Sequence, residues 1–594
     1  MNRWWALLLL VSSAVAATPP SNLITNIPGR KTISLDGAWH AIVDPFENGI
    51  GSGFFRDEKP HSKSDRVEYS FDLSPVLNVP GDWNTQRDDL MFYEGPVWYR
   101  REFNYHKQAG TRVFVYFGAA NYRTAAYLNG QKLGDHEGGF TAFNFEVTSS
   151  LREGTNVLVA EVNNMRRADG VPAMKFDWWS YGGITRDVML VEVPTVFVQD
   201  YSVQLTRGSH DEISGSVQLN GAQSPQSVTL EIPEAHVHET FNTDAQGYLS
   251  FHLKTKLELW SPEHPKLYDV IVSSGVDSVR DQIGFRTIEV QGEKILLNGK
   301  PVFLRGISMH EEAPFRGGRA FSTEDAQTLL GWVKDLGCNF VRLTHYPHNE
   351  NEIRLADRMG LMVWSEIPVY WDIDWSNPAT LANAQAQLRD MIARDHNRAA
   401  VVLWSMSNET PVKPERLVFL KQLAQDARNL DNTRLITSAL NHVDDTSPDV
   451  RTISDPMGDV LDVIGLNEYL GWYWGRPEDA DRMQWKSSFN KPIVVSEFGG
   501  GAPYGRHGDA EERWTEEYQD NLYQHQLAMI EKIPGLAGIT PWVLMDFRSP
   551  TRPLPGIQDY HNRKGVISDR GQRKMAFYTL QKFYAKLARA AQTQ

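Results

Sequence analysis

The sequence is poor in cysteine, in long apolar runs and in basic charge. Cys338 is the only cysteine among 594 residues, so no disulfide can form within one chain. After the first 17 residues, no segment approaches the roughly 20 apolar residues that span a bilayer. The net charge is −14, which argues against a nucleic-acid partner, because phosphate backbones require a basic surface. No His-Glu-x-x-His and no compact Cys/His cluster is present, and this disfavours a metalloenzyme.

The first residues have the pattern of an export signal. Arg3 provides a positive charge, Ala6–Val11 forms a short apolar core, and Ala14-Val15-Ala16 fits a cleavage site. We therefore expect residues 1–17 to be a cleavable signal peptide, and the protein to be periplasmic or secreted. No cysteine stands directly after this signal, so we expect no lipid anchor.

The length and the periodicity indicate three domains after the signal, because one hydrophobic core rarely serves so many residues. Residues 18–193 contain alternating strand-like runs, such as Arg112–Phe117 and Thr124–Leu128, and the second run is followed by the hairpin signal Asn129-Gly130. They predict a β-sandwich. Residues 194–285 contain further short strands, including Ser227–Ile232, and their span fits a small immunoglobulin-like sandwich.

Residues 286–594 alternate apolar strands with helical segments, which is typical of βα units. The predicted helices include Ser322–Leu336, Asn383–Arg394, Pro414–Leu430 and Glu511–Ile530. The predicted strands are Val302–Ile307, Asn339–Thr344, Met362–Glu366, Val401–Ser407, Leu435–Ala439, Val463–Asn467, Ile493–Glu497 and Gly538–Val543. Eight such strands predict a (β/α)8 TIM barrel, whose functional groups lie at the carboxyl ends of the strands.

Two glutamates follow strands of this predicted barrel. Glu409 comes just after the fourth strand, in Ser407-Asn408-Glu409, and Glu497 ends the seventh, so both belong to the same rim. Cleavage of a glycosidic bond requires one carboxyl group that protonates the leaving oxygen and a second beside the anomeric carbon. A single glutamate after a strand is usually a helix cap or a surface ion-pair partner, but the pair in these contexts points to glycoside hydrolysis.

Several motifs then lead to a resemblance. The N-terminal ones are Leu35-Asp36-Gly37-Ala38-Trp39, Val79-Pro80-Gly81-Asp82-Trp83, Trp98-Tyr99-Arg100-Arg101 and Leu128-Asn129-Gly130. The later ones are Leu297-Asn298-Gly299-Lys300-Pro301, Arg305-Gly306, His310-Glu311 and Asn339-Phe340-Val341-Arg342-Leu343-Thr344-His345-Tyr346-Pro347. In this order they resemble glycoside hydrolase family 2, which includes β-galactosidases, β-mannosidases and β-glucuronidases. The resemblance implies a jelly-roll β-sandwich, an immunoglobulin-like β-sandwich and a catalytic barrel, and it implies no cofactor.

The resemblance also assigns roles to residues of the barrel. Glu409 would be the acid/base and Glu497 the nucleophile of a retaining enzyme. Asn408 would bond the sugar 2-hydroxyl, whereas Arg342 and Tyr469 would support the carboxylate of Glu497. The other sugar-pocket candidates are His310, His345 and Trp542. Either histidine could instead be structural, and the indole of Trp542 would stack on the sugar.

The substrate clue is Asn562-Arg563-Lys564, which resembles the motif that binds a uronic acid carboxylate in β-glucuronidases. An ammonium and an amide can bind a carboxylate by charge-assisted hydrogen bonds, although a solvated surface loop is the alternative. Asp177, Asn467 and Tyr473 also match that subfamily. One position departs from the pattern: Gln558 replaces an arginine that contacts the carboxylate. We expect that Arg548 or Arg552, which lie nearby in sequence, could compensate.

The sequence therefore predicts an exo-acting, retaining β-glucuronidase that removes terminal β-D-glucuronic acid. The departure at Gln558 leaves a β-galacturonidase or β-galactosidase of the same family as the alternative. A non-catalytic carbohydrate-binding protein is a more distant one, because both glutamates are retained. We expect a carbohydrate as the partner, with no nucleic acid, no membrane anchor and no metal. The resemblance leaves a homo-oligomer open.

Overall fold

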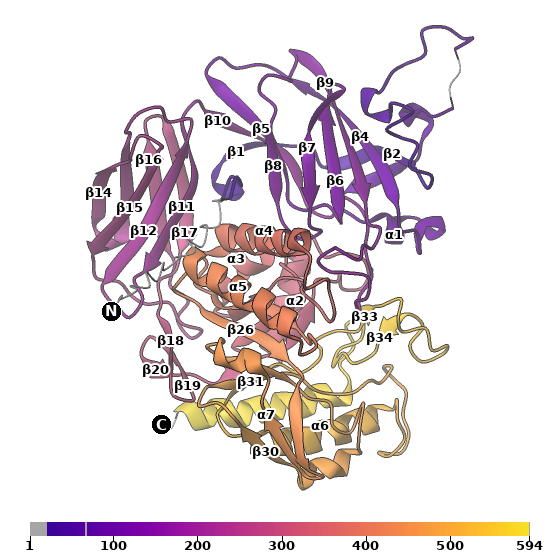
Figure 1. The fold of residues 1–594 in the computed structure, drawn as a ribbon, viewed down its shortest axis with the longest axis vertical. Coiled ribbons are helices and arrows are strands. Elements are labelled where there is room, and N and C mark those ends of the chain that lie inside the picture. Colours follow the sequence, from indigo (N-terminus) through magenta and orange to yellow (C-terminus); the bar gives the residue numbers. More distant parts are fainter. Residues whose placement is uncertain (1–20, 66–67, 593–594) are drawn as a thin grey trace, which may run out of the picture.

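The computed structural model describes residues 21–65 and 68–592. The expected signal peptide lies outside the described residues. Within these ranges, no helix is both long and apolar enough to cross a membrane. The described chain forms two β-sandwiches and a barrel of parallel strands (Figure 1). The predicted fold class is therefore confirmed.

The N-terminal β-sandwich consists of two antiparallel sheets. The first contains, in spatial order, β1 (Lys31–Ser34), β10 (Val188–Pro194), β5 (Thr111–Phe117) and β8 (Phe143–Glu146). The second contains β3 (Val76–Val79), β2 (Gly37–Val43), β4 (Pro96–Tyr105), β9 (Gly154–Asn163), β6 (Arg123–Leu128) and β7 (Gln131–Glu137). Trp39, Trp83 and Tyr99 are fully buried in its core. Asn129 and Gly130 between β6 and β7 both have positive φ, as a type I′ hairpin turn requires.

The second domain is a seven-stranded sandwich. One sheet contains β11 (Phe197–Leu205), β12 (Glu212–Asn220) and β15 (Tyr248–Lys254), and the other contains β14 (Val237–Asn242), β13 (Ser227–Ile232), β16 (Tyr268–Ser274) and β17 (Asp277–Ile283). Buried and partly buried residues alternate strictly along β16, because one face of the strand packs on the core and the other faces outward. Seven strands in two sheets are typical of the immunoglobulin architecture.

The barrel is closed by one sheet of parallel strands. In spatial order these are β21 (Leu304–Arg305), β32 (Leu536–Ile539), β31 (Ile493–Glu497), β29 (Ile464–Asn467), β26 (Leu435–Leu440), β25 (Val401–Asn408), β24 (Met362–Glu366), β23 (Phe340–Thr344) and β22 (Ser308–His310). The predicted first strand, Val302–Ile307, contains β21 and ends one residue before β22, so the first barrel strand extends further than predicted. This segment bonds β32 on one side and β23 on the other, and it thereby closes the barrel.

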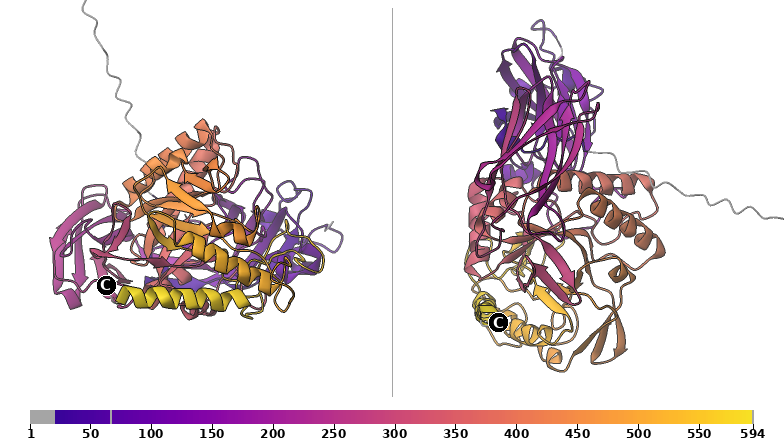
Figure 2. Two further views of the ribbon diagram at one scale, coloured as in Figure 1. Left: turned by 90° about the horizontal axis from the view of Figure 1, so that it is seen from below. Right: turned by 90° about the vertical axis from the view of Figure 1, so that its left-hand side faces the viewer.

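Helices cover the outside of the barrel. They are α2 (Thr323–Asp335), α3 (Glu350–Met359), α4 (Pro378–Asp395), α5 (Pro414–Leu430), α6 (Glu516–Ile530) and α7 (Met575–Gln592). Side chains set their starts: Ser322 forms a capping box with Asp325 at α2, and Thr515 caps α6. The Thr515 cap explains why α6 begins five residues later than predicted. α3 and α7 were not among the helices predicted from the sequence. Figure 2 shows α7 running beside α6.

The remaining strands form small sheets outside the barrel wall. They are β18 (Ile288–Gln291), β19 (Lys294–Leu297) and β20 (Lys300–Pro301); β27 (Val443–Ser447), β28 (Val450–Ile453) and β30 (Gln484–Ser487); and β33 (Phe547–Arg548) with β34 (His561–Asn562). The second of these sheets lies in the connections that follow β26 and β29, where long helices are absent from the described chain. The β33–β34 pair follows β32 and begins the loops that reach the active-site rim.

A buried ion pair joins the N-terminal sandwich to the barrel. Arg186, which precedes β10, donates from Nη2 to both carboxylate oxygens of Glu311 at 3.0 and 3.1 Å and to the carbonyl of Pro347 at 2.7 Å. Beside it, the ring of Phe140 stacks on Tyr346 of the barrel, with centroids 4.0 Å apart. These contacts fix the sandwich loops against the carboxyl-terminal rim of the barrel.

We expect Arg186→Leu to lower the free energy of unfolding by about 3 kcal/mol, because it leaves the buried Glu311 without its main partner. Lys132→Leu is the control, since Lys132 pairs with Asp135 on the exposed surface and should change stability by less than about 1 kcal/mol. Urea denaturation followed by tryptophan fluorescence measures both. An equal effect of the two substitutions would show that the buried pair does not stabilise the joint.

Candidate active site

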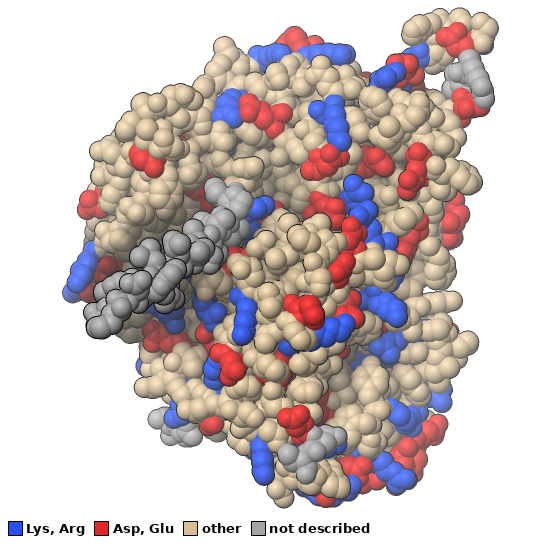
Figure 3. Space-filling view, in the orientation of Figure 1, with Lys and Arg blue, Asp and Glu red and all other residues tan. Residues whose placement is uncertain are grey.

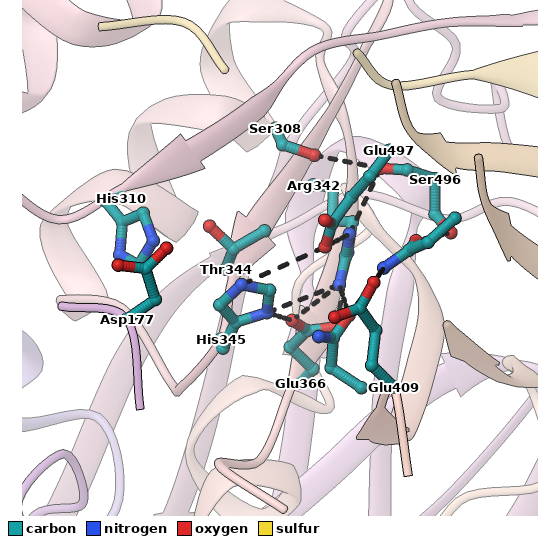
Figure 4. Close-up of polar contacts among 12 residues, drawn as sticks. Asp177, Ser308, His310, Arg342, Thr344, His345, Glu366, Glu409, Ser496 and Glu497 are labelled. Carbon is teal, nitrogen blue, oxygen red and sulfur yellow. Dashed lines mark hydrogen bonds and ion pairs between the residues drawn. The ribbon is translucent and has the colours of Figure 1, made fainter. Parts of the chain in front are cut away.

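Five parallel strands bring polar side chains to one rim of the barrel. Arg342 lies on β23, Glu366 ends β24, Asn408 ends β25, Asn467 ends β29 and Glu497 ends β31. The side chains of Arg342, Glu366 and Glu497 meet in the centre of the rim (Figure 4). Asn408 bonds Arg342, and Asn467 bonds Asn408. Carboxyl ends of parallel strands share one face of a barrel, and this places the two predicted glutamates together.

Glu497 is buried, and both of its carboxylate oxygens accept hydrogen bonds. Arg342 Nη1 donates to Oε1 at 2.8 Å, and the Tyr469 hydroxyl donates to Oε2 at 2.8 Å. Burial raises the pKa of Glu497 to about 7 and the nearby charge of Glu409 adds to this, whereas Arg342 and Tyr469 lower it. The two donors therefore favour the ionised carboxylate against the effect of burial.

Arg342 is fully buried and connects three strand ends. In addition to Glu497, its Nη2 donates to Asn408 Oδ1 at 2.8 Å and to Glu366 Oε1 at 3.1 Å, and its Nε donates to Glu366 Oε2 at 3.3 Å. The planar guanidinium thus binds Glu366 through Nε and Nη2, along one edge, and binds Glu497 through Nη1.

Glu366 is a site residue that the sequence analysis did not single out. It is buried and accepts hydrogen bonds from Arg342, from His345 Nδ1 at 2.8 Å and from Trp364 Nε1 at 2.8 Å. Burial raises the pKa of this carboxyl. The charge of Arg342 and the hydrogen bond from His345 lower the pKa by more than burial raises it, so that the net shift is downward. Its place at the end of a predicted strand was the signal that could have identified it.

Glu409 follows β25 and is half-buried. Its Oε1 accepts from Asn467 Nδ2 at 3.1 Å, and its Oε2 accepts from the indole Nε1 of Trp371 at 3.0 Å. The sequence analysis did not single out Trp371, which lies in the loop after β24. Ser496 Oγ donates to Asn467 Oδ1 at 2.7 Å, so the amide group of Asn467 presents its N–H to Glu409.

Asn408 has one amide donor without a partner. Its Oδ1 accepts from Arg342 at 2.8 Å and from Asn467 Nδ2 at 3.2 Å. These bonds orient the amide, and its buried Nδ2 forms no hydrogen bond within the described chain. Because an unpaired buried donor is costly, Nδ2 is suited to a ligand hydroxyl.

The two predicted histidines lie side by side with Trp542. The ring of His345 stacks on the indole at a centroid distance of 4.9 Å, and the ring of His310 meets it edge-on at 5.3 Å. Burial lowers the pKa of His345 to about 4, so this ring is neutral at pH 7. His310 Nδ1 bonds the Tyr346 hydroxyl at 3.1 Å, and its buried Nε2 has no hydrogen-bond partner among the described residues.

Asp177 reaches the barrel from the sandwich loop between β9 and β10. Its Oδ1 accepts from Ser549 Oγ at 2.6 Å and from Thr551 Oγ1 at 2.8 Å, and it forms an ion pair with Arg552. Asn562 Nδ2 donates to its Oδ2 at 3.2 Å. Asp177 therefore holds the loop that carries Arg552 and Asn562.

Lys564 is buried without a carboxylate partner. Its Nζ donates to the Tyr473 hydroxyl at 2.8 Å and lies 4.8 Å from the centroid of that ring. No ion pair joins it to any acidic side chain in the described part of the chain. Arg552 Nη2 approaches the same hydroxyl at 3.4 Å, so two cations meet at one phenol.

The two arginines expected to compensate for Gln558 lie in different places. Arg552 joins the cluster of Asp177, Tyr473 and Lys564. Arg548 instead directs its Nη1 toward the sulfur of Met91, 3.9 Å away. Of the two, only Arg552 has a side chain that contacts this cluster.

The described residues show no group of three or more His, Cys, Asp or Glu side chains that could hold a metal ion. Basic and acidic side chains are intermixed on the face shown in Figure 3, without a broad patch of one sign.

Comparison with known proteins gives the same family for each domain. Residues 32–194 match "Glycosyl hydrolases family 2, sugar binding domain", residues 196–286 match "Glycosyl hydrolases family 2", and residues 288–588 match "Glycosyl hydrolases family 2, TIM barrel domain". A β-glucuronidase of Paenibacillus borealis is 28% identical over 92% of this chain and 96% of its own. The β-glucuronidase of Rattus norvegicus is 28% identical over 98% and 94%.

Solved structures of similar proteins agree in fold. A β-glucuronidase from an uncultured Clostridium has a TM-score of 0.82 and 25% identity, covering 96% of this chain and all of its own. A β-galacturonidase from Eisenbergiella tayi has a TM-score of 0.79 at 24% identity, covering 95% of this chain and 98% of its own. The second likeness concerns the fold alone.

Proposed function

We propose, from the premise that the chain belongs to glycosyl hydrolase family 2, that it is a retaining, exo-acting β-glucuronidase. Membership of the family makes it a glycosidase that hydrolyses O-glycosyl bonds. The specific proposal is that it removes terminal β-D-glucuronic acid by double displacement. The β-glucuronidases among its relatives support this substrate class.

In the first step, Glu497 attacks the anomeric carbon while Glu409 donates a proton to the leaving oxygen. In the second, Glu409 takes a proton from water, which attacks the same carbon and releases Glu497. The two donors on Glu497 support its role as nucleophile, because they favour a carboxylate. Among the described residues, Glu409 accepts from the neutral N–H groups of Asn467 and Trp371, whereas Glu497 accepts from the cationic Arg342.

Asn408 is suited to recognise the sugar beside the reacting carbon. Its Oδ1 accepts from Arg342 and from Asn467, which also bonds Glu409, and its Nδ2 has no partner among the described residues. We assign this donor to the 2-hydroxyl, where hydrogen bonds strengthen in the transition state.

The observation that carries the uronide assignment is the buried ammonium of Lys564, which has no carboxylate at ion-pair distance among the described residues. A buried charge without a counter-ion is costly, and a substrate carboxylate would provide that counter-ion. The Tyr473 oxygen accepts from Lys564 and from Arg552, so its own hydroxyl hydrogen is free to donate to the same carboxylate. A neutral sugar would leave the charge of Lys564 uncompensated.

Because of Gln558, we keep a β-galacturonidase as the alternative. The sugar that such an enzyme removes differs from glucuronic acid in its configuration at C4. The carboxylate of Asp177 already bonds Arg552, Ser549, Thr551 and Asn562. We therefore expect Asp177 to influence recognition of the sugar C4 hydroxyl indirectly, by positioning Arg552. A non-catalytic binding protein is disfavoured, because both glutamates are present and held in one network.

The test of the proposed function is kcat/KM on aryl β-D-glucuronide, β-D-galacturonide, β-D-glucoside and β-D-galactoside. We expect the glucuronide to exceed the glucoside by at least about 100-fold, which is roughly 2.7 kcal/mol at the transition state. Lys564→Met, which keeps the length of the chain but removes its charge, should lower glucuronide turnover about 100-fold and glucoside turnover far less. An equal loss on both substrates would mean that Lys564 does not read the carboxylate.

The pH dependence should report Glu497. The nucleophile must be ionised, so kcat/KM should fall as the pH drops through about 7, where burial places the pKa of Glu497. Tyr469→Phe removes a bond that lowers this pKa, and the acid limb should therefore move to higher pH.

The control for this prediction is Tyr523→Phe. The Tyr523 hydroxyl is buried near Gly499 and has no hydrogen-bond partner in the described chain, so its removal should leave the limb in place. If Tyr469→Phe leaves the limb unmoved or shifts it to lower pH, Tyr469 does not stabilise the ionised nucleophile.

A further inference from the structure

Trp371 contacts Glu409 from the loop that leads from β24 to α4. Its indole Nε1–H donates to Glu409 Oε2 at 3.0 Å. Both residues adopt left-handed backbone conformations, with φ of 55° at Trp371 and 50° at Glu409. Such conformations are strained in residues other than glycine and persist where the surroundings impose them, often at functional sites.

The backbone of β25 holds this loop in place. Asn408 N donates to Val369 O at 2.9 Å, and Trp371 N donates to Asn408 O at 3.0 Å. The pairing of β24 with β25 thus continues past the strand ends to the residue before Glu409. The indole also packs on the ring of Tyr370, at a centroid distance of 4.6 Å. The donor is therefore fixed by its own backbone and by a neighbouring ring.

The two oxygens of Glu409 face different parts of the site. Oε1 accepts from Asn467, whose amide also bonds Asn408 and so connects to Arg342 and Glu497. Oε2 accepts from Trp371, which makes no hydrogen bond to that network other than through Glu409 and the Asn408 carbonyl. The two oxygens of Glu409 are thus bound by donors from two different elements, Asn467 at the end of β29 and Trp371 in the loop after β24.

We propose that Trp371 is a positioning residue that orients Glu409 for proton transfer to the leaving-group oxygen. An indole N–H can only donate, so it holds Oε2 in both protonation states of the carboxyl. With one N–H on each oxygen, the carboxyl has a single orientation. This inference rests on the acid/base role proposed for Glu409, but not on the identity of the sugar.

The test uses leaving groups that differ in their need for a proton. Phenol, with a pKa near 10, requires protonation as it leaves, whereas 2,4-dinitrophenolate leaves without it. Trp371→Phe should lower kcat/KM for the phenyl glycoside by about 10- to 100-fold, because a misplaced acid loses much of its effect. It should lower kcat/KM for the dinitrophenyl glycoside less than about threefold.

Trp375→Phe is the matched control. Trp375 lies in the same loop and its indole also donates to a carboxylate, Asp372 Oδ1, at 2.7 Å. It has no hydrogen bond or ion pair with Glu409 or Glu497 in the described chain. Its replacement should leave the ratio between the two substrates unchanged.

Trp371→His keeps a ring N–H donor and tolerates a left-handed backbone better than most residues, so it should restore part of the phenyl glycoside rate. It also provides the test if Trp371→Phe does not fold. Equal losses on both substrates, or no loss on either, would overturn the assignment of Trp371. If the unaltered protein hydrolyses neither the phenyl nor the dinitrophenyl glycoside, whichever sugar they carry, the proposed function is wrong, and the assignment of Trp371 is not what failed.

Discussion

The geometry of the active site depends on the buried guanidinium of Arg342. It binds Glu497, Glu366 and Asn408, which end three different barrel strands, so those strands share one register at the rim. An arginine that lost these partners would be an uncompensated buried charge. The same bonds that compensate the charge of Arg342 in the core therefore position Glu497, the proposed nucleophile, and the amide of Asn408, which we assign to the sugar. Small displacements of catalytic groups reduce rates strongly.

The pocket is complete only when the sandwich lies on the barrel. Asp177 belongs to the sandwich, yet its ion pair is with Arg552 of the barrel loop, and Asn562 bonds the same carboxylate. This pairs Arg552 with a carboxylate, whereas Lys564, which we propose binds the substrate carboxylate, has no ion pair in the described chain. The buried pair of Arg186 with Glu311 holds the two domains in this arrangement. Under the proposed function, a paired arginine beside a lysine without an ion pair would bind a carboxylate even though the protein is acidic overall.

Local patterns in the sequence predicted much of the fold. Strands such as Ser227–Ile232 and Ile493–Glu497 match the structure, because alternation and apolar runs are local properties. The strand-end rule and the family resemblance together placed Glu409 and Glu497 at one rim. Contacts between distant segments were harder. The role of Trp371 depends on a left-handed loop conformation, and only the folded chain shows that Arg552, rather than Arg548, contacts Lys564's partner Tyr473.

The central claim is that Glu497 attacks the sugar directly, so that the reaction proceeds with retention. The measurement that tests it most directly is proton NMR of the sugar released from an aryl β-D-glucuronide, recorded before mutarotation. We predict that the β-anomer appears first, and that the α-anomer grows only as the two forms equilibrate. If the α-anomer appears first, water rather than Glu497 attacks the anomeric carbon, and the assignment of Glu497 as nucleophile is wrong.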